Sequence, residues 1–302
     1  MRILVAGSTG VIGRQLMPLL TSAGHEAVGM VRRPAAAGRH VVADALQPDQ
    51  VRAAVETVRP DAVVNLLTAI PARINPAKLA RDMAMTNRLR TEGARNLLDA
   101  ARQAGTKRVI SEGLAYAYAP GTGLADEDAP LWARGPAQFQ PVVAALRELE
   151  DRTAREHGLV LRFGHLYGPG TAFARDGSFT ADVAAGKVPL VGGGNATFSF
   201  THTRDAAMAV LAGLDKDIAG TLNIVDDEPA PLHEWLPVLA GLLGAKRPKP
   251  APAWLARTMV GSYGVAFMNQ LRGADNTRAR LALDWRPGYR SWRDGFPAEL
   301  NH

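Results

Sequence analysis

The stretch that decides the fold is RILVAGSTGVIG, residues 2–13. Its apolar start predicts a buried strand, and Gly7, Gly10 and Gly13 follow three residues apart before a helical pattern begins. In such a turn the glycines allow a tight bend, close approach of a pyrophosphate and close helix packing, while the helix N-terminus offers free N–H groups. Three glycines alone are also compatible with a plain structural turn, but a strand before them and a helix after them favour a dinucleotide site. The expected phosphate-binding residues are Gly7, Ser8, Thr9, Gly10, Val11, Ile12 and Gly13.

Two arginines stand where the second strand is expected to end. In dinucleotide sites of this type, the residue after the second strand contacts the adenosine ribose. An acidic residue there accepts a hydrogen bond from the 2′-hydroxyl. This chain instead has Arg32 and Arg33, in GMVRRP. A guanidinium pair suits a 2′-phosphate, although two solvated surface arginines are the alternative. We therefore expect NADP(H) to be favoured over NAD(H).

Composition excludes several other classes of protein. The 302 residues carry 35 Lys and Arg against 29 Asp and Glu, a net charge of +6 that is spread along the chain. This mild basic bias suits an anionic cofactor and gives no argument for nucleic acid. The sequence has no cysteine, no metal-ligand spacing and no apolar run long enough for a membrane span. We expect a cytoplasmic α/β protein with a small-molecule substrate and no metal.

Strand and helix patterns alternate through the first half of the chain. They predict a Rossmann-type doubly wound parallel sheet followed by a smaller C-terminal substrate lobe. The cofactor domain is expected over 1–165, with 196–225 returning to it, and the substrate lobe over 166–195 and 226–302. The expected strands are 2–6, 26–31, 39–43, 61–67, 107–111 and 159–164, and the expected helices are 11–23, 49–58, 78–104 and 136–157.

Several further segments resemble the extended short-chain dehydrogenase/reductase superfamily, in its NAD(P)-dependent epimerase/dehydratase group. They are VVADALQP, VVNLLTA, TNRLRTEGARNLLDAARQAGTKRVI, LRFGHLYGPGT and FSFTHTRDAAMAVLAGL, so the resemblance covers nearly the whole chain. It implies that His202 and Asp205 anchor the second lobe, and that any homodimer forms through the two long helices. The cofactor contacts that it implies are Asp44, Ala45, Leu67, Thr68, Ala69, Asn87 and His165, the last at a place where asparagine is commoner.

The chain departs from that family at its usual catalytic pair. The family relies on Tyr-x-x-x-Lys, in which the lysine and the nicotinamide ribose lower the pKa of the tyrosine. No such motif occurs in this sequence, and Val142 and Leu146 stand at the two positions. Tyr118, Tyr116 and Glu112, expected just after the fifth strand, are the candidate catalytic replacements. Packed aromatics and a loop carboxylate bonded to backbone are the alternatives for them.

The function expected from these features is an NADP(H)-dependent oxidoreductase or epimerase with a non-standard proton donor. It would act at a carbonyl or carbinol carbon of a small polar or secondary-metabolite-like substrate, nucleotide sugars included. Arg175, Lys187 and Arg272 are the candidates for binding a substrate diphosphate. Two other functions stay open: a non-redox cyclase or dehydratase using the same cleft, and a non-catalytic NADP-binding sensor or scaffold.

Overall fold

Seven parallel strands form the sheet that carries the glycine turn. The computed structural model describes residues 1–34 and 38–300, and the sheet order is β11-β6-β5-β4-β1-β2-β3. The expected Rossmann-type sheet is therefore confirmed, with β11 added beside β6 at one edge. The strands are β1 (Arg2–Ala6), β2 (Glu26–Val31), β3 (His40–Val42), β4 (Ala62–Asn65), β5 (Arg108–Leu114), β6 (Leu159–Phe163) and β11 (Gly220–Ile224).

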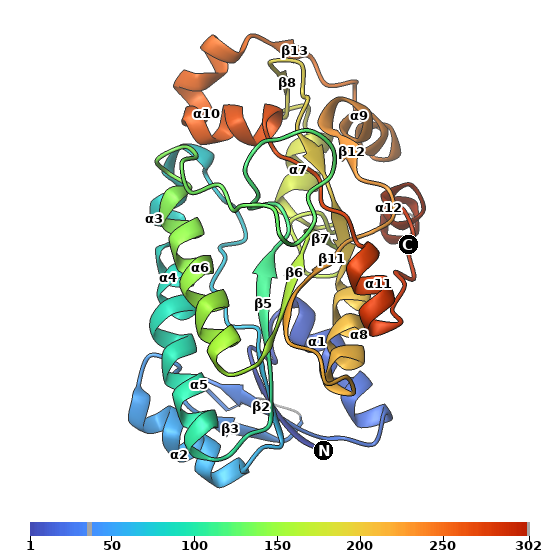
Figure 1. The fold of residues 1–302 in the computed structure, drawn as a ribbon. Helices are drawn as coiled ribbons and strands as arrows, with labels where there is room; N and C mark the ends of the chain where they lie inside the picture. Colours follow the sequence, from blue (N-terminus) through green and yellow to red (C-terminus); the bar gives the residue numbers. More distant parts are fainter. Residues whose placement is uncertain (35–37, 301–302) are drawn as a thin grey trace.

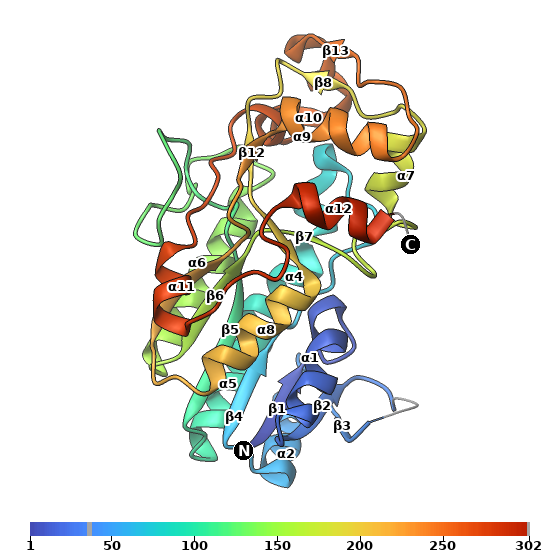
Figure 2. The same cartoon turned by 90° about the vertical axis from the view of Figure 1, so that its right-hand side faces the viewer.

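Helices cover both faces of this sheet, as Figures 1 and 2 show. On one face, α1 (Val11–Ser22) lies against α8 (Thr203–Leu214), and their apolar sides pack onto the sheet. On the other face lie α2 (Pro48–Val58), α5 (Ala94–Gln103) and α6 (Gln140–Arg155). The strands read as continuous apolar runs because both of their faces are buried in this way.

The helix expected over 78–104 is not continuous, which corrects the sequence prediction. It consists of a 3-10 turn (Pro76–Lys78), α3 (Leu79–Asp82), α4 (Ala84–Arg88), a π-helical turn η2 (Leu89–Gly93) and α5. Asn75 caps its start, because its side chain accepts a hydrogen bond from the Ala77 N–H at 3.0 Å. A π turn is wider than an α turn and changes which side chains face inward. Here it contains the buried Arg90.

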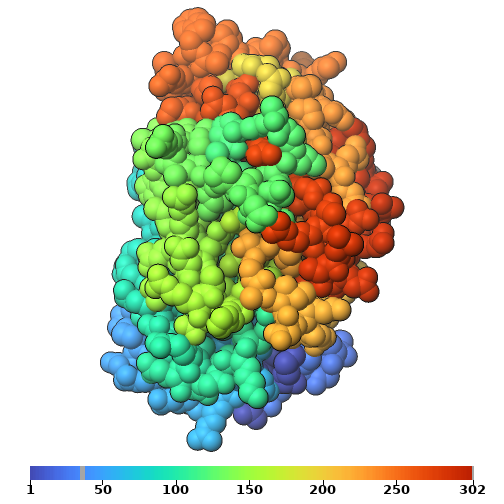
Figure 3. Space-filling view, in the orientation of Figure 1, coloured from blue at the N-terminus to red at the C-terminus, as the bar shows by residue number. Residues whose placement is uncertain are grey.

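Of the remaining elements, all but α11 form a smaller C-terminal region above the carboxyl ends of the strands, whereas α11 lies beside β11 and α8 (Figure 1). A cluster of large aromatic side chains fills its core, among them Trp235, Phe198, Phe200 and Phe296. Figure 3 shows the orange and red C-terminal residues lying against the green residues from the middle of the chain. In the described part of the chain, no helix is long and apolar enough to cross a membrane. The elements are β7 (His165–Tyr167), α7 (Ser178–Ala184), β8 (Leu190–Val191), β9 (Thr197–Phe198), β10 (Phe200–His202), β12 (Ala230–Pro231), α9 (Leu232–Leu242), β13 (Pro250–Ala251), α10 (Ala253–Asn269), α11 (Thr277–Leu283) and α12 (Trp292–Leu300).

Candidate active site

The glycine turn lies at the point where the strand order reverses, between β1 and β4. Ligands of doubly wound sheets bind in the crevice at this switch point. Gly7 has a φ of +91°, and a Cβ built on it would lie 2.5 Å from the Leu66 carbonyl oxygen. A Cβ on Gly13 would lie 2.3 Å from the Gly7 carbonyl oxygen. The turn therefore requires glycine at positions 7 and 13. Because neither residue has a side chain, neither covers the backbone of the turn where it faces the crevice.

The N-terminus of α1 is open to an anionic ligand. Gly10 is its N-cap, with no side-chain cap, and the first turn contains no acidic residue. The first N–H groups of the helix, at Val11, Ile12 and Gly13, have no acceptor within the helix. Thr9 and Gly10 are exposed, whereas Ser8 is buried against Gly29. The helix dipole and these free N–H groups together fit a pyrophosphate.

The residues expected around the adenosine lie at the neighbouring strand ends. Arg32 and Arg33 follow β2 and are both exposed. Asp44 follows β3, and its carboxylate accepts from the Leu46 N–H at 3.0 Å. Ala45 is buried, and its carbonyl accepts from the Asn96 side chain at 2.9 Å. This places a cationic pair and an ordered loop on the β2–β3 side of the glycine turn.

The segment after β4 reaches the other side of the turn. Leu67 and Ala69 are half-buried, and Thr68 is exposed. The Ala69 N–H donates to the Thr86 hydroxyl at 3.1 Å, which ties this segment to α4. Asn87, the next residue on α4, has a buried Oδ1 with no hydrogen-bond partner in the part of the chain that the structure describes.

Sequence reasoning missed Arg90, the charged residue buried deepest near this edge. Its side chain is 1% exposed, and it donates to Glu112 from Nε at 2.8 Å and from Nη2 at 3.3 Å. Its third nitrogen, Nη1, is buried without a partner among the described residues. A signal was present, because Met83, Arg90 and Leu97 recur seven apart on the buried side of the helix.

Glu112 does not lie in a loop, which corrects the prediction. β5 continues to Leu114, so Glu112 is inside the strand, buried and held by Arg90. A buried carboxylate paired in two places with a guanidinium is stabilised by charge-assisted hydrogen bonds. Its structural role is thus to hold Arg90 in place.

Tyr118 and Tyr116 have different partners in the structure. Tyr118 is fully buried, where its hydroxyl donates to Asn223 Oδ1 at 2.6 Å and accepts from Arg162 Nη1 at 2.7 Å. Burial raises the pKa of Tyr118. The hydroxyl of this residue is therefore engaged in a closed internal network that also includes Glu150, the partner of Arg162.

Tyr116 and His165 form a stacked pair after β5 and β6. Their ring centroids are 4.2 Å apart with an interplanar angle of 24°. Burial raises the pKa of Tyr116 to about 12, so its hydroxyl is protonated at neutral pH. Burial lowers the pKa of His165 to about 3, so the imidazole is neutral. Its Nδ1 lies 3.3 Å from the Ser199 carbonyl, and its Nε2 is buried without a partner among the described residues.

The two residues that the sequence comparison places at the family's usual catalytic pair are part of the apolar core. Val142 and Leu146 lie on α6 and are 1% and 0% exposed. They belong to the same apolar cluster as Phe139 and Leu114. No proton relay is available from these two side chains, so the α6 side of the site is apolar at both positions.

The other candidates are structural or exposed. His202 lies 3.1 Å from Glu299, and Asp205 accepts from the backbone of Gly288 at 2.9 Å, so both connect β10 and α8 to the C-terminal segment. Arg272 donates to the carbonyls of Gly123 and Leu124. Arg175 and Lys187 are exposed. A role of these three candidate cations in binding a diphosphate stays a prediction.

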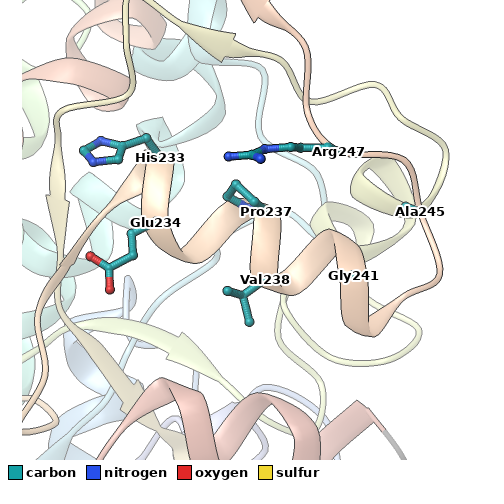
Figure 4. A pocket seen from close by; sticks show the side chains of 7 residues that line it. All are labelled: His233, Glu234, Pro237, Val238, Gly241, Ala245 and Arg247. Carbon is teal, nitrogen blue, oxygen red and sulfur yellow. The ribbon is translucent and has the colours of Figure 1, made fainter.

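A surface groove on α9, drawn in Figure 4, is lined by none of the predicted cofactor-binding or catalytic residues. Its charged side chains include Glu234, which is paired with Arg293. The groove therefore adds nothing to the crevice between β1 and β4. Its lining residues are His233, Glu234, Pro237, Val238, Gly241, Ala245 and Arg247.

Comparison with known proteins decides the family. The model of the NAD dependent epimerase/dehydratase family matches residues 3–224. This chain belongs to that family. Membership agrees with the glycine cradle at the switch point, and it makes the chain an NAD(P)-dependent enzyme of the reductase/epimerase type.

Relatives of this epimerase/dehydratase family member include two named reductases. A 3-diazoavenalumate denitrifying reductase from a Streptomyces species is 45% identical over 311 residues, covering 99% of this chain and 100% of the relative. A ceramide reductase from Caulobacter vibrioides is 25% identical, covering 99% of this chain and 90% of the relative.

Solved structures share the fold over the whole chain. The UDP-glucose 4-epimerase of Thermus thermophilus in complex with NAD has a TM-score of 0.75 at 20% identity, covering 100% of this chain and 98% of that one. The human epimerase family protein SDR39U1 with NADPH has a TM-score of 0.78 at 21% identity, covering 100% of both chains. At this level of identity the likeness supports the fold alone.

Proposed function

We propose that this chain is an NADP(H)-dependent reductase that removes N₂ from a small metabolite bearing a diazonium group by hydride transfer. The observation that carries the proposal is an intact dinucleotide cradle in a chain whose Tyr-x-x-x-Lys positions are buried Val142 and Leu146. The relative at 45% identity is named as a denitrifying reductase of a diazo compound. Relatives named as reductases favour reduction over epimerisation, cyclisation or a sensor role.

The proposed chemistry explains why the proton relay is dispensable. When bound, the reduced dinucleotide supplies a hydride. The diazonium-bearing carbon gains that hydride, its C–N bond breaks, and N₂ leaves with the electron pair of the broken bond. No oxyanion develops, so no acid is needed to protonate one. Orientation of the reacting carbon against the cofactor is then the main contribution of the protein.

The proposed assignment of NADP(H) rests on the exposed Arg32 and Arg33 after β2. Guanidinium groups at this place match a 2′-phosphate, and the sequence offers no acidic residue there for an unmodified ribose. We also assign residues 1–165 and 196–225 to cofactor binding, and residues 166–195 and 226–302 to substrate selection.

Carbonyl reduction is the second candidate, and Tyr116 is the observation that favours it. Its ring stacks on His165 beyond the end of β5, which places a phenol near the strand ends. Burial raises its pKa to about 12, so the hydroxyl is protonated at neutral pH, as in any tyrosine, and is a weaker acid than an exposed one. A protonated phenol at this edge could deliver a proton to a substrate oxygen.

A matched pair of probes separates the two candidates. Diazotised 3-aminobenzoate and 3-formylbenzoate carry the same ring and carboxylate, and differ in the group to be reduced. With NADPH deuterated at the transferable position of C4, the proposal predicts deuterated benzoate and N₂ above the enzyme-free rate, with little turnover of the aldehyde. Turnover of the aldehyde alone would establish the second candidate. Binding of NADPH without turnover of either probe would favour the sensor role.

A further inference from the structure

This chain lacks one cation that the family resemblance leads us to expect beside the nicotinamide half of the cofactor. The family resemblance places a lysine near the nicotinamide ribose, and Leu146 occupies its place in the core. The π turn η2 packs against α6, the helix that contains Leu146. Arg90 projects from that turn and provides a buried cation from a neighbouring helix.

The geometry of Arg90 leaves one hydrogen-bonding edge free. A guanidinium has five N–H donors, and Glu112 engages Nε and Nη2 at 2.8 and 3.3 Å. Nη1 is shielded and has no partner within residues 1–34 and 38–300. A buried donor without an acceptor is costly, because it has lost its hydrogen bonds to water. An acceptor supplied by a bound molecule would remove this cost.

The surroundings of Arg90 include Tyr116, one of the candidate catalytic residues. Arg90 and Glu112 are close enough to Tyr116 to influence its titration. Asn87, one turn earlier on the same helix, has a buried oxygen that also lacks a partner among the described residues. A donor and an acceptor without partners thus lie one turn apart, beside the segment that follows β4.

We propose that Arg90 replaces the missing lysine and holds the nicotinamide-riboside half of the cofactor, with Nη1 donating to one of its oxygens. The acceptor is a ribose hydroxyl or the carboxamide oxygen. Glu112 is a positioning residue, because it fixes the guanidinium plane and balances its charge. This inference rests on the proposed use of NADP(H), and it assigns a role that the glycine cradle does not provide.

A series of cofactor fragments tests the proposal by binding alone. Calorimetric affinities are measured for NADPH, for 2′-phospho-ADP-ribose, which lacks only the nicotinamide, and for 2′-phospho-ADP, which lacks the nicotinamide and its ribose but keeps both phosphates of the pyrophosphate. The principal variant is Arg90→Met combined with Glu112→Met, since replacing both partners leaves no unpaired buried charge. Arg90→Lys is the conservative variant, in which Glu112 keeps a cationic partner.

The expected result is a selective loss at the nicotinamide end. The double variant should bind NADPH about tenfold or more weakly, while 2′-phospho-ADP binding changes by less than about twofold. If the affinity for 2′-phospho-ADP-ribose also falls, the acceptor is a ribose oxygen. If only the affinity for NADPH falls, the acceptor is the carboxamide oxygen. Arg90→Lys should lose less than the double variant. Equal affinity changes for all three ligands, or no change for any, would overturn the proposal.

A second buried ion pair provides the matched control. Arg162 donates to Glu150 from Nε and Nη2, both at 2.7 Å. Arg162 is in β6, which is separated from β1 and the glycine cradle by β5 and β4. Arg162→Met with Glu150→Met should lower the melting temperature without changing the affinity ratio of NADPH to 2′-phospho-ADP. If wild-type protein binds NADH and not NADPH, the same series is run with NADH, ADP-ribose and ADP. Failure of wild type to bind either dinucleotide would refute the proposed function itself, a result distinct from failure of the Arg90 variants to discriminate.

Discussion

His165 stacks on Tyr116 with ring centroids 4.2 Å apart, although the two residues come from the ends of different strands. Phe198 and Phe267 surround the same imidazole at 4.4 and 5.6 Å. The pair therefore joins the carboxyl ends of β5 and β6 to the C-terminal region. It also keeps a neutral imidazole and a protonated phenol in contact at neutral pH.

The buried imidazole predicts a pH dependence of folding stability. The pKa of His165 falls to about 3 in the folded protein, below its ordinary value of 6.5. Between pH 3 and pH 6.5 the His165 imidazole is protonated in the unfolded chain and neutral in the folded protein. The free energy of unfolding therefore rises with pH across this window and reaches its full value above it. The slope from this residue approaches about 1.4 kcal/mol per pH unit. Urea unfolding of wild type and His165→Asn should show a flatter dependence for the variant; identical slopes would contradict the assignment.

Removing the Tyr116 hydroxyl should separate its packing role from a role in proton transfer. Tyr116→Phe keeps the ring against His165 and deletes the phenol. For the proposed diazo reduction, we expect kcat to change by less than about threefold, because no proton is delivered to the product. Carbonyl reduction through this hydroxyl would instead lose about a hundredfold or more. Single-turnover rates of wild type and Tyr116→Phe with diazotised 3-aminobenzoate and with 3-formylbenzoate show whether the hydroxyl takes part in proton transfer.

The arginine pair after β2 should control cofactor preference. Arg32→Ala and Arg33→Ala should each weaken NADPH about tenfold and change NADH binding much less, because only NADPH carries the 2′-phosphate. Arg286→Ala, another exposed arginine, serves as the control for net charge. Equal losses for both dinucleotides would remove the argument for NADP(H).

The cradle glycine at position 13 should not tolerate a methyl group. In Gly13→Ala the new Cβ would lie 2.3 Å from the Gly7 carbonyl oxygen, so α1 must move away from the turn. We expect a stability loss of about 1–3 kcal/mol and weaker binding of either dinucleotide. Gly241→Ala on α9, where nothing lies within 4 Å of the added carbon, should stabilise the protein by about 0.5–1 kcal/mol. Thermal unfolding with and without cofactor measures both effects.

The sequence alone allowed a correct prediction of those parts of the fold in which local geometry determines the residue type. The cradle could be predicted because Gly7 and Gly13 leave no room for a side chain, and the sheet because its strands are apolar on both faces. The environment of Glu112 could not be predicted, because β5 extends past the expected end. Tyr118 and Asn223 meet although they are 105 residues apart, a contact without a local signal.

The π turn at Leu89–Gly93 has a consequence for how this protein can vary. Such a turn holds one residue more than an α-helix needs, so loss of a single codon there would restore regular winding. The helices before and after the turn would keep their orientation, because the wide turn has already absorbed the extra residue, and only the side chains within the turn would point elsewhere. The side chain facing Glu112 would be exchanged in one step, and cofactor contacts in this helix could change without any substitution at the contact itself.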